Sequence, residues 1–131
     1  MKKLVIDTGV LTLFFAGDER VAPYFRQIQN GQAEGYIAST NLAEFYYKVC
    51  QKLGRETATL RYHQSRAVLA PVETDEELTL AAGILKCRNS GLSLTDSFAL
   101  ALAERVRGTL LTTDRELAKV REVTTKFFPI Q

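Results

Sequence analysis

The sequence predicts an α/β fold in which a short, mainly parallel sheet lies between two layers of helices, a three-layer α/β/α arrangement. Two observations lead to this class. Short apolar segments of strand length alternate with longer segments whose apolar residues recur at helical spacing, and such alternation favours a parallel sheet covered on both faces. The length of 131 residues, 46% of them hydrophobic, suits a single domain over residues 1–131 with a core of its own.

The predicted strands are short and apolar, as expected for a sheet that is buried on both sides. The first of them ends in a carboxylate, because Asp7 directly follows Leu-Val-Ile. The predicted strands cover residues 3–7, 35–39, 109–113 and 123–127, with a minimal strand or a turn at 71–72.

The predicted helices are bounded by recognisable start and stop residues. Gly54 and Gly108 stand where a helix would end, and Pro23 is compatible with a helix if it falls in the first turn. The expected helices cover residues 9–16, 18–30, 41–53, 55–69, 75–89 and 95–107, and a short helix starts near residue 114.

The overall charge does not by itself indicate a nucleic-acid partner, since 17 basic residues face 15 acidic ones. Residues 48–70 differ, because they hold five basic residues and one acidic residue, a local net charge of +4, with Tyr46, Tyr47 and Tyr62 interleaved. Such a surface can hold an RNA backbone and stack an unpaired base. The alternative is a solvated helix pair whose tyrosines belong partly to the core. His63 is expected to be a surface or interface histidine.

Export and membrane insertion are not expected. Asp7 and Gly9 interrupt the apolar N-terminal run, and no run approaches the roughly 18 residues of a membrane span. The expectation is a soluble, cytoplasmic protein without a membrane partner. Cys50 and Cys87 are expected to be buried small hydrophobes, with a disulfide as the alternative.

Four acids follow the ends of predicted strands or open predicted helices: Asp7, Glu44, Asp96 and Asp114. In a parallel sheet all four can reach the same edge. Converging carboxylates repel one another unless a cation lies among them, and ligation by oxygen alone favours Mg²⁺ or Mn²⁺. Such an ion can activate a water and neutralise charge on a phosphoryl group, so the hydrolysis of a phosphodiester bond is the natural chemistry.

A structural interpretation of the same acids stays open. Asn41 and Glu44 fit the spacing of a capping box in which Glu44 lies in the first helical turn, and Asp96 and Asp114 also stand at helix starts. Asp7 can cap a helix too, but a charge placed directly after Leu-Val-Ile needs a partner or a cation.

Four segments that contain these acids resemble, in order, the four motifs of the PIN-domain family. They are Leu-Val-Ile-Asp-Thr-Gly-Val-Leu at 4–11, Ser-Thr-Asn-Leu-Ala-Glu-Phe at 39–45, Leu-Thr-Asp-Ser-Phe-Ala-Leu-Ala at 94–101 and Leu-Leu-Thr-Thr-Asp-Arg-Glu-Leu at 110–117. Within the family the pattern is similar to the VapC group, the toxin halves of bacterial and archaeal toxin–antitoxin pairs. The resemblance spans nearly the whole chain.

The resemblance implies an Mg²⁺- or Mn²⁺-dependent endoribonuclease that forms a homodimer and is inhibited by a cognate VapB-like antitoxin. It implies that the four acids bind the metal and act in catalysis, that Thr112 orders the site and that Glu116 supports it. In the family, the helices over 48–70 contribute to the antitoxin groove and to the dimer contact.

One position departs from the family pattern. Gly9 stands where many members have Ser or Asn, so a side-chain hydrogen bond near Asp7 is expected to be missing and the first helical turn to be looser. The alternative function is a catalytically silent PIN scaffold that binds RNA or protein. A third possibility is an aspartyl-phosphate phosphotransferase. Such an enzyme needs a second acid at position 9, where this chain has Gly9.

Overall fold

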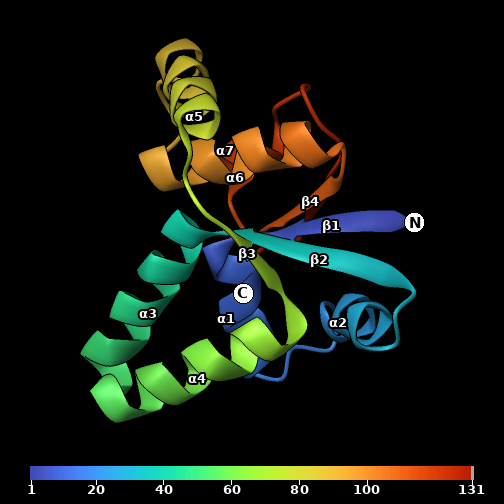
Figure 1. Ribbon diagram of the computed structural model, residues 1–131, viewed down its shortest axis with the longest axis vertical. Helices are drawn as coiled ribbons and strands as arrows, with labels where there is room; N and C mark the ends of the chain where they lie inside the picture. The colour runs from blue at the N-terminus through green and yellow to red at the C-terminus, as the bar shows by residue number, and fades with distance from the viewer. Residues whose placement is uncertain (131) are drawn as a thin grey trace.

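The computed structural model, which describes residues 1–130, confirms the predicted three-layer α/β/α class (Figure 1). One sheet holds all the strands in the order β3-β2-β1-β4-β5, and every neighbouring pair is parallel. The strands are β1 (Lys2–Ile6), β2 (Ala33–Ala38), β3 (Ala70–Val72), β4 (Thr109–Thr112) and β5 (Thr125–Phe127).

The helices form two layers, one on each face of the sheet. In Figure 1, α5, α6 and α7 lie above the sheet, and α1 to α4 lie below it. The helices are α1 (Thr8–Phe15), α2 (Ala22–Gln29), α3 (Ser39–Leu53), α4 (Arg55–Val68), α5 (Glu76–Arg88), α6 (Leu94–Val106) and α7 (Arg115–Ala118).

The central strand shows why the predicted strands read as continuous apolar runs. Leu4 and Ile6 of β1 pack into the core cluster on the α1–α4 side, whereas Val5 packs into the cluster on the α5–α7 side. Successive side chains of a strand point to opposite faces, so a strand covered on both faces needs apolar residues at every position. All three side chains are buried.

Two helix starts differ from their predictions. The helix predicted from residue 18 begins only at Ala22, because Asp18 accepts hydrogen bonds from the backbone N–H and guanidinium of Arg20 and holds a turn there. This later start places Pro23 in the first turn, which is the condition under which a proline is compatible with a helix. The helix predicted from residue 41 begins at Ser39, which moves Glu44 out of the first turn and into the second.

The chain reverses its direction across the sheet at β1. It runs outward from β1 through β2 to β3 and then returns to β4 on the other side of β1. This reversal places a topological switch point between β1 and β4, and ligands of open α/β sheets bind beyond the carboxyl ends of the strands at such a point. Within residues 1–130, no helix combines the length and the apolar character needed to span a membrane.

Candidate functional site

Asp7 follows the last residue of β1 and lies at the switch point, with only 2% of its surface exposed. Its Oδ1 accepts a hydrogen bond from the backbone N–H of Val10 at 2.8 Å, so Asp7 is the N-cap of α1. Its Oδ2 accepts hydrogen bonds from the Thr112 hydroxyl and from the backbone N–H of Thr113. Asp7 therefore caps a helix, although among the four acids it was the one that the sequence least favoured as a cap.

Burial determines the protonation behaviour of Asp7. Desolvation raises the pKa of this carboxyl from 3.8 to about 6, although hydrogen bonds from Thr112, Val10 and Thr113 oppose the shift. The nearby charge of Asp114 raises the pKa further. Asp7 is thus a fixed carboxylate whose negative charge is poorly solvated.

Thr112 connects Asp7 with Asp114. Its side chain is fully buried at the end of β4, and its hydroxyl donates to Asp7 while accepting from the backbone N–H of Asp114 at 2.9 Å. Asp114 is the N-cap of α7, because its Oδ1 accepts from the N–H groups of Glu116 and Leu117. One hydroxyl therefore fixes the spacing between two of the predicted acids.

Asp96 lies in the first turn of α6, which covers the same face of the sheet as α7 (Figure 1). Ser93 caps this helix and accepts a hydrogen bond from the backbone N–H of Asp96 at 3.0 Å. Burial first, and then the charge of Asp114, raise the pKa of Asp96 from 3.8 to about 7. Asp7 and a hydrogen bond with the Asp114 carboxyl add to this rise. Three carboxylates from three segments thus influence one another.

Glu44 stands on another wall of the site, formed by α3. The predicted capping box around it does not form, since Ala38 is the N-cap of α3 and provides no side-chain hydrogen bond. Asn41 is instead buried, and its amide donates to the Thr8 hydroxyl at 3.3 Å, which ties α3 to α1. Glu44 is left to form an ion pair with Lys48 at 3.8 Å.

The four predicted acids line one open cleft of about 660 Å³, which we call the acidic cleft. Lys48 and Lys52 of α3 line it as well, together with Thr113. Glu116 does not line it. Its side chain is exposed, lies 3.4 Å from Lys119 and borders a separate hollow with Asn89 and Leu92.

The donor set of the acidic cleft suits a hard divalent cation. Within residues 1–130, no group of three or more Asp, Glu, His or Cys side chains is arranged as a ready-made metal site. Mg²⁺ is often held by one or two carboxylates and several waters, however, and Asp96 and Asp114 supply two adjacent carboxylates. Burial first, and then the nearby charges of Asp114 and Asp7, raise the pKa of Asp96, and a bound cation would favour its charged form.

Gly9 does not loosen the first turn of α1, contrary to the expectation from the sequence. The helix begins at Thr8, and Leu11 donates its backbone N–H to the Asp7 carbonyl at 3.1 Å. A Cβ at position 9 would lie 1.9 Å from the Thr113 Oγ1. The side chain of Thr113 therefore occupies the space that a larger residue at position 9 would need.

The basic segment over residues 48–70 is not a single face. Lys48 and Lys52 point to the acidic cleft, whereas Arg66 lines a different cavity on the other side of α3. The sequence contained a signal for the two lysines, because they follow Glu44 at intervals of four residues and so share its helix face. The expectation of two buried cysteines was wrong for Cys87, which is exposed, and holds only in part for Cys50, which is half-buried; both cysteines are free.

The fold and the site together define an α/β protein with carboxylates gathered at the switch point of a parallel sheet. The family model of the PIN domain matches residues 4–123. The chain belongs to the PIN-domain family. No curated protein sequence matches it.

Solved structures share this fold at low sequence identity. The DNA-bound VapBC of Salmonella typhimurium matches with a TM-score of 0.79 and 16% identity, covering 96% of this chain and 98% of that chain. VapBC2 of Rickettsia felis, bound to a DNA fragment from its promoter, matches with a TM-score of 0.76 and 16% identity, with the same coverage of both chains. VapC20 of Mycobacterium tuberculosis, a toxin that cleaves the sarcin–ricin loop, matches with a TM-score of 0.71 and 18% identity. The match covers 92% of this chain and 98% of that chain.

Proposed function

We propose that this chain is a VapC-like endoribonuclease that depends on Mg²⁺ or Mn²⁺. The observation that carries the proposal is the meeting of Asp7, Asp96 and Asp114 at the switch point, where the pKa of Asp96 rises to about 7. Membership of the PIN-domain family supports it, and the RNA-cleaving activity of the similar VapC20 favours RNA as the substrate.

The residues divide the chemical work. Asp96 and Asp114, with Asp7 behind them, would hold the cation, which when bound supplies a polarised water and neutralises phosphoryl charge. Thr112 keeps Asp7 and Asp114 in register through its two hydrogen bonds. Glu44 faces them from α3 and would orient the attacking water and accept its proton. Lys48 and Lys52 would bind phosphates beside the scissile bond.

RNA cleavage with and without EDTA tests the proposal. We expect wild type to cut RNA with Mg²⁺ or Mn²⁺, and expect EDTA, Asp7→Asn or Asp96→Asn to remove the activity. Cleavage that survives chelation and both substitutions would show that the proposed mechanism is wrong.

A catalytically silent PIN scaffold is the second candidate. The absence of a ready-made three-ligand group within residues 1–130, and the pairing of Glu44 with Lys48, favour it. Calorimetric titration with Mn²⁺ separates the two functions. A nuclease binds the ion and loses binding in Asp96→Asn, whereas a scaffold shows no binding in wild type.

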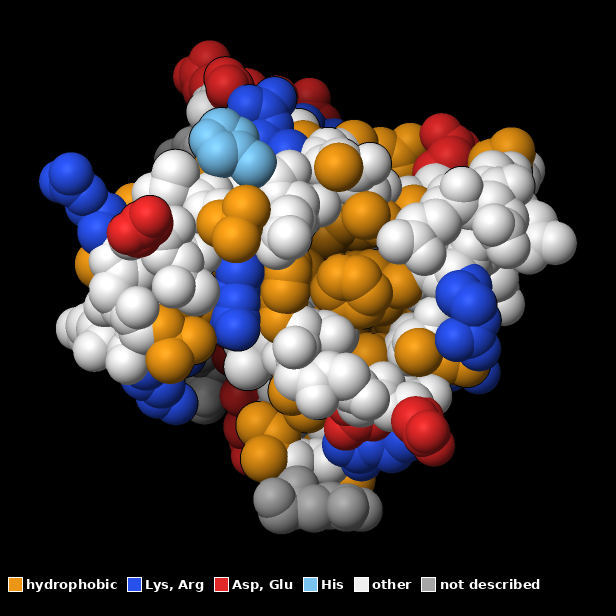
Figure 2. Space-filling model, turned by 90° about the horizontal axis from the view of Figure 1, so that it is seen from below, with side chains coloured by type: hydrophobic (Ala, Val, Ile, Leu, Met, Phe, Trp, Pro, Cys, Tyr) orange, Lys and Arg blue, Asp and Glu red, His pale blue; other side chains and the backbone are white. Residues whose placement is uncertain are grey.

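A VapB-like antitoxin is the proposed protein partner. The DNA-bound neighbours are complexes of VapB with VapC, and Figure 2 shows an apolar hollow on the lower face of the molecule, with basic side chains around it. Half-exposed Leu13, Phe14 and Phe15 of α1 belong to the core cluster on this side. Inhibition of RNA cleavage by the product of an adjacent gene would test this partner.

A homodimer is also proposed. Leu80 and Ile84 stand one turn apart on α5 and are 60% and 50% exposed, so they form an apolar stripe that a second copy can cover. Sedimentation of wild type and of Leu80→Glu tests it. We expect a dimer that dissociates in the variant, and a monomeric wild type would contradict the proposal.

A further inference from the structure

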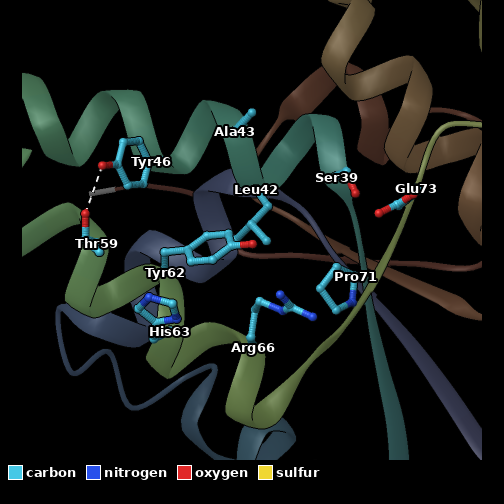
Figure 3. A pocket seen from close by; sticks show the side chains of 10 residues that line it. All are labelled: Ser39, Leu42, Ala43, Tyr46, Thr59, Tyr62, His63, Arg66, Pro71 and Glu73. Atoms are coloured by element: carbon cyan, nitrogen blue, oxygen red, sulfur yellow. Dashed lines mark hydrogen bonds between the residues drawn. The ribbon is translucent and has the colours of Figure 1, made fainter.

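A second cavity lies across α3 from the acidic cleft. It has a volume of about 520 Å³ and is enclosed by α3, α4 and the segment around β3 (Figure 3). We call it the α3–α4 pocket. Its lining includes Tyr46, Tyr62, His63, Arg66, Pro71 and Glu73.

The aromatic side chains of the α3–α4 pocket hold one another in place. The Tyr46 hydroxyl forms a hydrogen bond of 2.9 Å with the Thr59 hydroxyl, and the Tyr46 ring meets the Tyr62 ring edge-on, with centroids 6.4 Å apart. His63 meets Tyr62 edge-on as well, at 5.3 Å. Tyr62 extends into the cavity (Figure 3). A ring that is already oriented loses little entropy when a planar ligand stacks on it.

Two oppositely charged side chains line this pocket, and both are exposed to solvent. Within residues 1–130, neither Arg66 nor Glu73 forms an ion pair or a side-chain hydrogen bond, although both line the same cavity. Arg66 lies 6.0 Å from the centre of the Tyr62 ring. A ligand that is complementary to Tyr62, Arg66 and Glu73 would present a flat face, a negative charge and an edge of hydrogen-bond donors. A nucleotide carries all three.

A third hollow borders both the α3–α4 pocket and the acidic cleft. This hollow, between α3 and the start of α6, shares Glu44 with the acidic cleft and Ala43 with the α3–α4 pocket. Tyr47, which is 48% exposed, lines the same hollow and offers a surface on the way. An RNA strand bound in the acidic cleft can thus continue across α3 to the α3–α4 pocket.

We propose that the α3–α4 pocket binds an unpaired base of the RNA strand that lies in the acidic cleft. The identity of the strand rests on the proposed function. The base stacks on Tyr62, its phosphate meets Arg66, and the Glu73 carboxylate accepts hydrogen bonds from the base edge. Guanine fits best, because its ring N–H and amino group are adjacent donors, whereas uracil has one N–H between two carbonyls.

A tryptophan at position 62 tests the stacking directly. The chain contains no tryptophan, so Tyr62→Trp introduces a single reporter, which a stacked base quenches. We would use the Asp96→Asn background, which prevents cleavage, with a short single-stranded oligoribonucleotide. We expect quenching when the RNA binds and its loss when one particular nucleotide is made abasic. Tyr24→Trp, on α2, is the matched control and should not respond.

Affinity measurements by fluorescence anisotropy test the remaining contacts. Tyr62→Leu should weaken RNA binding about 5- to 150-fold, the usual range for one stacked base, while Tyr62→Phe should bind as wild type does. Arg66→Ala should weaken binding more than Arg55→Ala, which removes the same charge from the start of α4. Glu73→Gln should remove a preference for guanine over uracil.

The outcomes separate this inference from the proposed function. RNA binding without quenching at position 62 would overturn the inference while cleavage by wild type still stood. Quenching by an antitoxin peptide and not by RNA would also overturn it. Quenching by RNA in a protein that cuts no RNA would support the pocket and reject the nuclease.

Discussion

The acidic cleft and the α3–α4 pocket lie on two sides of the same helix, but they are built in different ways. Two acids of the cleft, Asp7 and Asp114, are fixed by backbone hydrogen bonds as N-caps, and Asp96 lies in the first turn after the N-cap Ser93. The pocket is formed by side chains that hold one another, such as Tyr46 and Tyr62. The comparison teaches that reaction geometry can come from strand ends and helix starts, while recognition can come from helix faces.

The largest expected effect is a loss of RNA cleavage in the acidic cleft, with base binding in the α3–α4 pocket unchanged. Asp96→Asn should lower RNA cleavage by about a thousandfold or more, because it removes a carboxylate that would hold the cation, and the cation neutralises charge on the reacting phosphate. It should leave quenching of the reporter at position 62 intact. Single-turnover cleavage and fluorescence measure the two properties. A parallel loss of both would mean that cleft and pocket are not separate.

The next effect tests how far the cleft depends on Thr112. Thr112→Val keeps the shape but removes the hydroxyl that donates to Asp7 and accepts from the backbone of Asp114. We expect cleavage to fall about 10- to 100-fold, as when a supporting group behind a metal ligand is lost. The free energy of unfolding should fall by about 1–3 kcal/mol. Thr109→Val, at the other end of β4, is the control and should cleave RNA normally.

A smaller effect concerns the dependence of thermal stability on pH, which should come from the carboxyls of the acidic cleft and not from the α3–α4 pocket. The pKa values of Asp7 and Asp96 rise from 3.8 in the unfolded chain to about 6 and about 7 in the folded protein. A raised carboxyl pKa favours folding at low pH, and this stabilisation is lost as pH rises through the folded value. The metal-free protein should therefore unfold at a lower temperature at pH 8 than at pH 5.

Thermal unfolding in EDTA measures this pH dependence. Asp96→Asn should reduce it, and Mg²⁺ at pH 8 should raise the unfolding temperature of wild type. An equal dependence in wild type and variant would show that Asp96 is not the titrating group. Substitutions in the α3–α4 pocket, such as Tyr62→Phe, should leave the dependence unchanged.

The smallest effect concerns the contact between Gly9 and Thr113. Gly9→Ala should lower the free energy of unfolding by about 1–2 kcal/mol, since the new Cβ would collide with Thr113. Thr113→Ala should relieve much of this loss in the double variant. Denaturant unfolding of the two single variants and the double variant measures the coupling, and additive losses would contradict it.

The sequence predicted most of the fold because local signals and burial agree. The apolar run before Asp7 is a central strand, and both of its faces are covered as the pattern indicated. The start of α3 was less predictable. Asn41 looked like a helix cap, but it is buried against Thr8 of α1, and a contact between distant segments leaves no local pattern.

The candidate site was predictable in part for the same reason. Its four acids stand in recognisable strand and helix contexts, and the structure brings all four into one cleft. Glu116 lies outside it, and its predicted supporting role stays a prediction. The α3–α4 pocket could not be foreseen, because the separation of Lys48 from Arg66 depends on how α3 and α4 cross.

The pairing of β1 with β4 has a consequence for the timing of synthesis. β1 leaves the ribosome well before β4, yet Leu4 pairs with Thr109, and Asp114 follows only after β4. The acidic cleft therefore cannot assemble until the segment through Asp114 has emerged. The proposed nuclease would therefore be inactive while β4 and Asp114 are still inside the ribosomal tunnel.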